Sequence, residues 1–385
     1  MGRPYSKARG GAAIVVAAAD TPGVLKSRAD LVCTGTSSTG GDEDSINAAL
    51  GRADAVILCP GTFWVSGSIS LGTGQALSGC GPSSIIKVRN NHNANLNVIT
   101  NPSSSVDHIT VRNLKIDGNK TNQTSGAMNG VYFNLYVTNT QITDCFGENM
   151  YGGSAIAFYG QIGMSPLAEC RLAIMGNFLQ ENVNGIRLVG AHQVLVQGNT
   201  CFKNDQYGMW LTWFSNDNSI VGNISLLNSQ AASNAYSDIY LESRSNQNII
   251  QANSCKPGGI HIGETPSKYG IEIDDCHDNL VVGNDLYDET YSFKTAALYN
   301  LGTNIIKNNR GYNPVGISSI TVGASPYTYT ARASPETIYV SGGTITSITK
   351  GGKNFGLTSG AFNLEPYESI IVTYTVAPTM FKDVH

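Results

Sequence analysis

The stretch NIIQANSC, at residues 248–255, decides the fold, because close variants of it recur along the chain as QVLVQGNTC, NSIVGNIS, NLVVGNDL and NIIKNNRG. Each copy sets a short apolar run before an asparagine. Successive asparagines lie 22 to 31 residues apart, and they are Asn177, Asn199, Asn223, Asn253, Asn284 and Asn309. A period of roughly 26 residues falls within the range of solenoid proteins.

A second repeated element keeps step with the first. Each copy is a short strand in which two apolar residues flank one residue of the opposite face, and the copies begin at Val131, Ile156, Ile186, Met209, Ile239, Ile271 and Ala297. Apolar residues alternate with period two, and Gly, Asn and Asp punctuate the segments, which is typical of strands and not of helical repeats. The pattern predicts an all-β fold, a right-handed parallel β-helix from about Ala55 to Asn313.

The repeated asparagines have a structural explanation. Asn tolerates left-handed backbone at turns, and its amide can hydrogen-bond to the turns above and below. We therefore expect the Asn row to mark one corner of each coil and not an active site. In the interior, Ile186, Met209, Ile239 and Ile271 are predicted to stack in one column.

The two ends of the chain differ from the repeats. Residues 1–54 contain two strand-like segments and an acid-started helix at 42–53, which predict an α/β cap and attachment segment. Residues 55–314 form the predicted β-helix. Residues 315–385 alternate again, as in PETIYVSGGTITSI, and predict a small antiparallel, β-sandwich-like domain.

Composition excludes several classes of function. The 385 residues carry a net charge of -4 with no basic run, which argues against a nucleic-acid partner. The longest apolar run, AAIVVAAA, is too short to cross a bilayer, and no segment has the pattern of a secretion signal. The eight cysteines lack metal-ligand spacing, so we expect buried thiols, no metal and no cofactor.

Residues 44–88 resemble the entry segment of right-handed β-helix proteins of the pectate-lyase superfamily, which includes phage tailspikes and mannuronan epimerases. The resemblance rests on Ile46-Asn47-Ala48-Ala49, on Pro60-Gly61-Thr62-Phe63, and on Leu77, Gly79 and Gly81. The N-terminal segment 15–35, continuing through the helix at 42–53, and the segment 335–348 are similar to β-helix proteins of phage and prophage regions. The resemblance implies a virion or extracellular surface protein, a homotrimer, and surface polysaccharide and other virion proteins as partners.

The epimerase motif Tyr-Gly-Phe-Asp-Pro-His has its nearest counterpart here in residues 151–156, which read YGGSAI. The Tyr and Gly are present, and the Asp and His are not. Proton abstraction beside a uronate needs a base and a group that neutralises the carboxylate, so the resemblance does not extend to that active site.

Alternation along the strands predicts two outward rows on one face. The first reads Tyr132, Ala157, Arg187, Trp210, Tyr240, Glu272 and Leu298, and the second reads Asn134, Tyr159, Val189, Thr212, Glu242, Asp274 and Asn300. Aromatic and acidic side chains on a long shallow face suit an extended sugar polymer. The predicted substrate-binding residues are Trp210, Tyr240, Arg187, Tyr159 and Tyr132, with Arg187 placed to bind an acidic substituent.

The predicted catalytic residues are Glu242, Glu272 and Asp274, which should meet on neighbouring coils. Like charges at such a distance raise the pKa of at least one carboxyl, and glycosidases use carboxyl pairs about 5 to 9.5 Å apart. Nearby, residues 258–270 carry His261 and Lys268 in a coil insertion that could overhang the face. An acidic patch without catalysis explains the same carboxylates.

Three functions are consistent with these features. The leading hypothesis is a phage-type virion protein that recognises, and in one version cleaves, a surface polysaccharide. The second is a secreted polysaccharide lyase, glycoside hydrolase or epimerase. The third is a structural decoration protein without a ligand.

Overall fold

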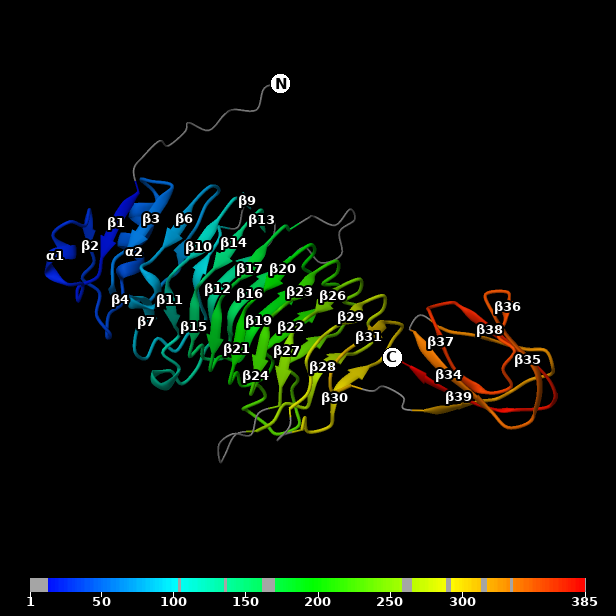
Figure 1. Cartoon of the computed structure of the whole chain (residues 1–385). Helices are drawn as coiled ribbons and strands as arrows, with labels where there is room; N and C mark the ends of the chain where they lie inside the picture. The colour runs from blue at the N-terminus through cyan, green and yellow to red at the C-terminus, as the bar shows by residue number, and fades with distance from the viewer. Residues whose placement is uncertain are drawn as a thin grey trace, which may run out of the picture.

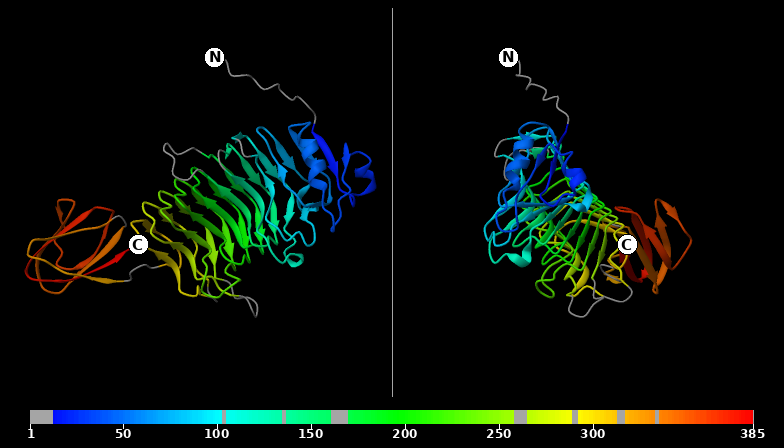
Figure 2. Two further views of the ribbon diagram at one scale, coloured as in Figure 1. Left: turned by 180° about the vertical axis from the view of Figure 1, so that it is seen from behind. Right: turned by 90° about the vertical axis from the view of Figure 1, so that its left-hand side faces the viewer.

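The computed structural model of the chain describes residues 13–102, 105–134, 137–160, 170–257, 265–288, 292–312, 317–332 and 335–384. The chain winds into a stack of parallel β coils, followed by two antiparallel sheets beyond the last coil (Figure 1). Figure 2 shows the stack from behind and from its N-terminal end. The predicted right-handed parallel β-helix is confirmed.

Three parallel sheets wrap around the stack. In spatial order, sheet 1 contains β2 (Leu31–Val32), β1 (Ile14–Ala17), β3 (Ala55–Leu58), β6 (Ala76–Ser78), β10 (Thr110–Arg112), β14 (Gln141–Thr143), β17 (Ala173–Met175), β20 (Leu195–Gln197), β23 (Ser219–Val221), β26 (Ile249–Gln251), β29 (Leu280–Val282) and β31 (Ile305–Lys307). Sheet 2 contains β27 (Ser254–Lys256), β24 (Ile224–Leu226), β21 (Thr200–Phe202), β18 (Phe178–Gln180), β15 (Phe146–Glu148), β11 (Lys115–Asp117), β7 (Ser84–Val88) and β4 (Gly61–Val65).

Sheet 3 carries the predicted site. It contains β30 (Ala296–Asn300), β28 (Tyr269–Ile273), β25 (Ile239–Leu241), β22 (Met209–Thr212), β19 (Asn184–Val189), β16 (Ser154–Tyr159), β12 (Met128–Asn134), β8 (Leu96–Thr100) and β5 (Ile69–Ser70). A short pair, β9 (Val106–Asp107) and β13 (Val137–Thr138), lies beside the early coils. Within a coil the chain runs from sheet 3 to sheet 1, then to sheet 2, and back to sheet 3.

The first coil is covered by the N-terminal segment. Helix α1 (Gly23–Lys26) is exposed, whereas α2 (Asp42–Leu50) buries Ile46, Ala49 and Leu50 against β1, β3, β4 and β5. This helix shields the open end of the apolar column, as the sequence predicts. Two 3-10 turns, η1 (Gly81–Ser83) and η2 (Lys120–Asn122), lie in loops of the early coils.

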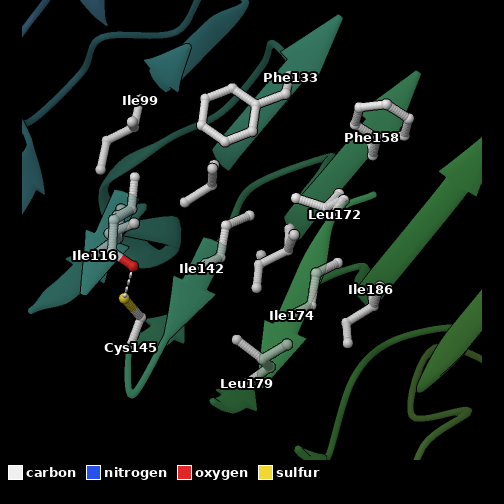
Figure 3. Packing of buried hydrophobic residues seen from close by; sticks show 14 of the residues in the cluster. Ile99, Ile116, Phe133, Ile142, Cys145, Phe158, Leu172, Ile174, Leu179 and Ile186 are labelled. Carbon is white, nitrogen blue, oxygen red and sulfur yellow. Dashed lines mark hydrogen bonds between the residues drawn. The ribbon is translucent and has the colours of Figure 1, made fainter. Parts of the chain in front are cut away.

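The interior is a continuous column of apolar side chains. Ile186 pairs with Met209, Met209 with Ile239 and Ile239 with Ile271, and all four are fully buried, which confirms their predicted stacking. Figure 3 shows the same stacking in earlier coils, where Phe133 lies beside Phe158 and Ile142 beside Ile174. Parallel pairing places equivalent positions of successive coils one above another, so each apolar residue is buried by the equivalent residues of the coils on either side.

The predicted asparagine row lies at the corner between sheets 1 and 2. The backbone N–H and the Nδ2 of Asn199 donate to Asn223 Oδ1 at 2.9 and 3.0 Å, and the same Nδ2 donates to the Ile174 carbonyl at 2.8 Å. The pattern continues from Asn177 to Asn309. Each amide thus satisfies backbone groups that the turn leaves buried.

One detail of that prediction is wrong. The left-handed residue at this corner is the one before the asparagine, with φ of 63° at Gly198, 64° at Gly222 and 53° at Ala252. That residue turns the chain, which leaves the asparagine free to direct its amide inward. Two more rows do the same at the other corners, and all of their members except the half-buried Asn304 are buried: Asn218, Asn248, Asn279 and Asn304, and Asn182, Asn204 and Asn228.

The C-terminal residues form two antiparallel sheets with a core of their own. One sheet has the order β32 (Ser318–Ile320), β39 (Thr379–Val384), β34 (Glu336–Ser341) and β37 (Gly360–Leu364). The other has the order β33 (Tyr327–Thr330), β38 (Ser369–Val376), β35 (Thr344–Lys350) and β36 (Lys353–Asn354). Ile338, Ile348 and Val372 are fully buried within this separate cluster.

Candidate functional site

The outer face of sheet 3 brings the predicted site residues into register. Arg187 pairs with Trp210, Trp210 with Tyr240, and Tyr240 with Glu272, so these residues follow one another on successive coils. Since their neighbours on each strand fill the core, the alternation of the strands turns these side chains to the outside. We call this face the sheet 3 face, and it comprises Tyr132, Tyr159, Arg187, Tyr207, Trp210, Tyr240, Glu242, Lys268, Glu272 and Asp274.

The last coil departs from the predicted row. Leu298 pairs with inward Ile271 and is 4% exposed, whereas Tyr299 pairs with Glu272. The sequence AALYN offers two apolar residues in succession, Ala297 and Leu298, and the larger one fills the core. Tyr299 therefore takes the outward position and stacks on Tyr269 with ring centroids 5.3 Å apart.

Arg187 lies between two aromatic rings. Its guanidinium carbon is 4.1 Å from the centroid of the Trp210 ring and 5.4 Å from that of Tyr159. Tyr159 in turn contacts Tyr132, with centroids 5.1 Å apart. Within the described residues the guanidinium has no carboxylate partner, and its buried Nε has no hydrogen-bond acceptor. A cation held by rings and unpaired by acids is well suited to an anionic ligand group.

Glu242 is fixed by three donors on the same face. Trp210 Nε1 donates to Oε1 at 3.0 Å, and the Thr212 hydroxyl donates to the same oxygen at 2.9 Å. The Tyr240 hydroxyl donates to Oε2 at 3.2 Å. Because these contacts come from two neighbouring coils, the carboxylate has one defined position.

Tyrosines from the loops before the strands complete the face. Tyr207 stacks on Tyr240 with centroids 4.9 Å apart and contacts the Trp210 ring at 5.3 Å. Tyr236 meets the Tyr207 ring edge-on at 5.2 Å. The Arg187 guanidinium and the rings of Trp210, Tyr207 and Tyr240 therefore form one continuous stack of contacts on this face.

Glu272 belongs to a separate polar group at the next coil. Lys268 Nζ contacts its Oε1 at 3.0 Å, and the Ser237 hydroxyl donates to its Oε2. Burial lowers the pKa of the Lys268 ammonium, but the hydrogen bond and the charge of Glu272 outweigh it, and the net shift is upward. Lys268 also lies 4.8 Å from the Tyr269 ring.

The three predicted catalytic carboxylates do share this face. Asp274 lies one coil beyond Glu242, since the Glu242 N–H donates to Leu211 and the Asp274 N–H donates to Leu241. Burial raises the pKa of the Tyr240 hydroxyl well above its usual range, and the charges of Glu242, Glu272 and Asp274 raise it further. Of the three carboxylates, Glu242 contacts the phenol directly, at 3.2 Å.

Sequence reasoning missed Tyr207, Tyr236 and Ser237, and it placed Lys268 only in an insertion that could overhang the face, without the ion pair to Glu272. The signal was present, because QYGMW and AYSDIY each place a tyrosine three or four residues before the outward residue. SKYGIE repeats the spacing with Lys268. His261 of the same insertion lies outside the described residues.

The described residues show no group of three His, Cys, Asp or Glu side chains arranged to hold a metal ion. The eight cysteines are free thiols, and all of them except Cys80 are buried. Burial raises the pKa of the Cys145 thiol to about 12. Among the helices of the described segments, none has the length and apolar character needed to cross a membrane.

Comparison with known proteins gives one family. The family model described as periplasmic copper-binding protein (NosD) matches residues 68–319. No curated protein matches the sequence.

Several solved structures are similar at low identity. The A-module of mannuronan C-5 epimerase AlgE4 from Azotobacter vinelandii is 14% identical with a TM-score of 0.47, covering 71% of this chain and 93% of that one. The Dettilon tailspike protein is 14% identical with a TM-score of 0.47, covering 88% and 90%. The enzymatically active domain of tailspike protein 2 from bacteriophage CBA120 is 10% identical with a TM-score of 0.48, covering 88% and 67%.

Proposed function

The chain belongs to the NosD family, and from the geometry of its sheet 3 face we propose that it is a surface protein that binds an acidic polysaccharide. The observation that carries the proposal is Arg187, a cation held between Tyr159 and Trp210 without a carboxylate partner among the described residues. A sugar carboxylate or sulfate would supply the missing anion.

The rest of the face supports an extended sugar ligand. Beyond Trp210, the fixed carboxylate of Glu242 accepts hydrogen bonds and the Lys268 ammonium donates them, so the face alternates donors and acceptors along the helix axis. Neighbouring coils are about 4.8 Å apart, so the three steps from Arg187 to Glu272 span roughly 14 Å. A polymer lying along the coils would contact several of these groups at once.

Copper, which the family description names, is not part of this proposal. Copper sites use imidazole, thiolate and thioether ligands brought together in a defined geometry. In the ranges that the structure describes, no such cluster of His, Cys, Asp or Glu occurs, and the donor set does not fit the metal.

The finer proposal is a phage-type virion protein, assembled as a homotrimer with other virion proteins as partners. It is supported by the resemblance of residues 15–35 and 335–348 to phage and prophage β-helix proteins, and of residues 44–88 to a superfamily that includes phage tailspikes. In this setting the polysaccharide would be that of the host surface.

Cleavage of the bound polymer is a second candidate function, favoured by the positions of Glu242, Glu272 and Asp274 on neighbouring coils of the sheet 3 face. Hydrolysis needs one protonated and one ionised carboxyl beside the scissile bond. Of the three, Glu242 already accepts hydrogen bonds from Trp210, Thr212 and Tyr240, which suits it to orient the substrate or stabilise positive charge.

Binding and cleavage separate experimentally. We expect the protein to bind acidic members of an array of bacterial surface polysaccharides and to prefer them over neutral ones. Release of reducing ends from the bound polysaccharides then tests cleavage, with Glu242→Gln, Glu272→Gln and Asp274→Asn as single variants. Binding without release of reducing ends supports a recognition protein. If the protein binds no polysaccharide, the proposal is contradicted and a decoration protein without a ligand becomes the better explanation.

A further inference from the structure

A separate hollow lies at the turn that leaves sheet 3 toward sheet 1. Its volume is about 200 Å³, and its lining residues are Trp213, Phe214, Ser243, Arg244 and Asp275. These residues come from three successive coils and directly follow the outward positions 212, 242 and 274 in sequence. The hollow therefore continues the sheet 3 face around its edge.

Two large aromatic side chains are exposed at this turn. Trp213 is 53% exposed and Phe214 is 37% exposed, so burial does not explain them. Their φ angles are 52° and 61°, a left-handed region that bulky residues seldom adopt. One coil later the same turn uses Ser243 and Arg244 at φ of 55° and 62°, which shows that the backbone does not require aromatic residues. Strained residues of this kind gather at ligand sites.

The charged side chains that line the hollow, Arg244 and Asp275, have opposite charges. The Arg244 guanidinium carbon lies 5.8 Å from the centroid of the Phe214 ring. The Asp275 side chain is 74% exposed, and its Oδ1 is 3.8 Å from His277 Nε2. One cation, one carboxylate and the Ser243 hydroxyl give the hollow donors and acceptors without a strong net charge, unlike the unpaired Arg187.

We propose that this hollow is a subsite for an uncharged pyranose unit of the bound polysaccharide. The apolar C–H face of the sugar would lie on Trp213, its hydroxyls would donate to Asp275, and Arg244 would donate to its oxygens. The inference rests on the proposed function, since it assigns the neutral sugar to the turn and the acidic group to Arg187. The ligand of the protein is then a heteropolymer with acidic and neutral units.

Selective labelling of tryptophan tests the assignment. The chain has three tryptophans, Trp64, Trp210 and Trp213, and ¹⁵N-labelled indole gives one N–H signal for each. The probes are the methyl glycosides of glucose, galactose and mannose, with the three corresponding uronates. We expect neutral glycosides to shift the Trp213 signal at millimolar concentrations while Trp64 stays unchanged, and uronates to shift Trp210 through Arg187.

Variants assign the effect to the lining residues. Trp213→Ala removes the ring contact, and we expect it to weaken binding of the best neutral glycoside, read by sugar-observed saturation transfer, by about fivefold or more. Asp275→Asn should weaken binding by about tenfold, because a neutral amide oxygen accepts a weaker hydrogen bond than a carboxylate. Asp278→Asn, at an exposed position of the same turn, is the matched control and should have no effect.

The two proposals fail differently. A Trp213 signal that no neutral glycoside moves, or that uronates move more strongly, overturns the neutral subsite. If Trp210 still responds to uronates in that case, the acidic site of the proposed function remains. A response of Trp213 alone supports the subsite and removes the role assigned to Arg187.

Discussion

Asp238 makes the stability of the protein depend on pH in a direction opposite to that of most carboxylates. Its side chain is fully buried beneath sheet 3, where Asn228 Nδ2 donates to it at 2.7 Å and the Ser225 hydroxyl at 3.2 Å. Burial raises its pKa from 3.8 to about 8, although hydrogen bonds from Asn228, Ser267 and Ser225 lower it. The folded protein therefore holds a proton that the unfolded chain releases between these two values.

The size of the effect follows from this shift. Between pH 3.8 and pH 8 the folded state binds one more proton than the unfolded state, so stability is highest at the acid end and falls by about 1.4 kcal/mol per pH unit. At pH 7 the cost of Asp238 is then about 4 kcal/mol, and between about pH 5 and pH 7 it changes by roughly 2.7 kcal/mol. Asp238→Asn keeps the shape and removes the titration.

Urea unfolding at about pH 5, 6 and 7 tests this reasoning. We expect the free energy of unfolding of Asp238→Asn to rise relative to the wild type as pH increases, by about 1.4 kcal/mol per unit. Asp217→Asn, at an exposed turn position, is the control and should follow the wild type. If the curves of the wild type and Asp238→Asn run parallel from pH 5 to pH 7, the buried carboxyl does not titrate as argued.

Four further predictions concern the stability and assembly of the fold. Asn199→Ala leaves buried backbone groups unpaired and should lower the free energy of unfolding by about 3 kcal/mol. Gln197→Ala, on the exposed face, should change it by less than about 0.5 kcal/mol, and equal effects of the two variants in urea unfolding would contradict the stabilising role of the asparagine row. Ile239→Ala should lower it by about 2 to 5 kcal/mol, and an unchanged melting temperature would place this residue outside the core. Lys268→Met leaves the buried Glu272 without its ion-pair partner and should lower the free energy of unfolding by about 1 to 2 kcal/mol at neutral pH. Adding Glu272→Gln should recover most of this stability, and no recovery would show that the lost ion pair is not the cause. Sedimentation equilibrium should give a trimer, and a full-length protein that stays monomeric at micromolar concentration contradicts the proposed assembly.

The sequence predicts the coils well because every coil buries its apolar residues in the same way, with the same period-two alternation. Ile186, Met209, Ile239 and Ile271 could be assigned to the interior from period-two alternation alone, and the structure places all four there. The prediction was wrong at the last coil, where either Ala297 or Leu298 could occupy the one inward position. Alternation does not choose between them, and side-chain volume does.

The site was predictable only as far as the strands position it. Register placed Trp210, Tyr240 and Glu272 in one row, but Tyr207 and Lys268 lie before the strands, where period-two alternation does not indicate the direction of a side chain. Asp238 was missed for a related reason. It precedes Ile239 in a polar segment, and no local pattern indicates that its side chain enters the core.

The proposed function requires that the sheet 3 face binds the polysaccharide. A structure of the protein in complex with an oligosaccharide cut from that polysaccharide tests this requirement. We predict that the sugar chain lies along sheet 3, with an acidic group at Arg187 and hydroxyls at Glu242. In solution, Arg187→Met should weaken binding of the same oligosaccharide about tenfold or more, while Arg112→Met on the exposed face of sheet 1 should not. An oligosaccharide bound to sheet 1, sheet 2 or the C-terminal sheets, with sheet 3 empty, would contradict the proposal.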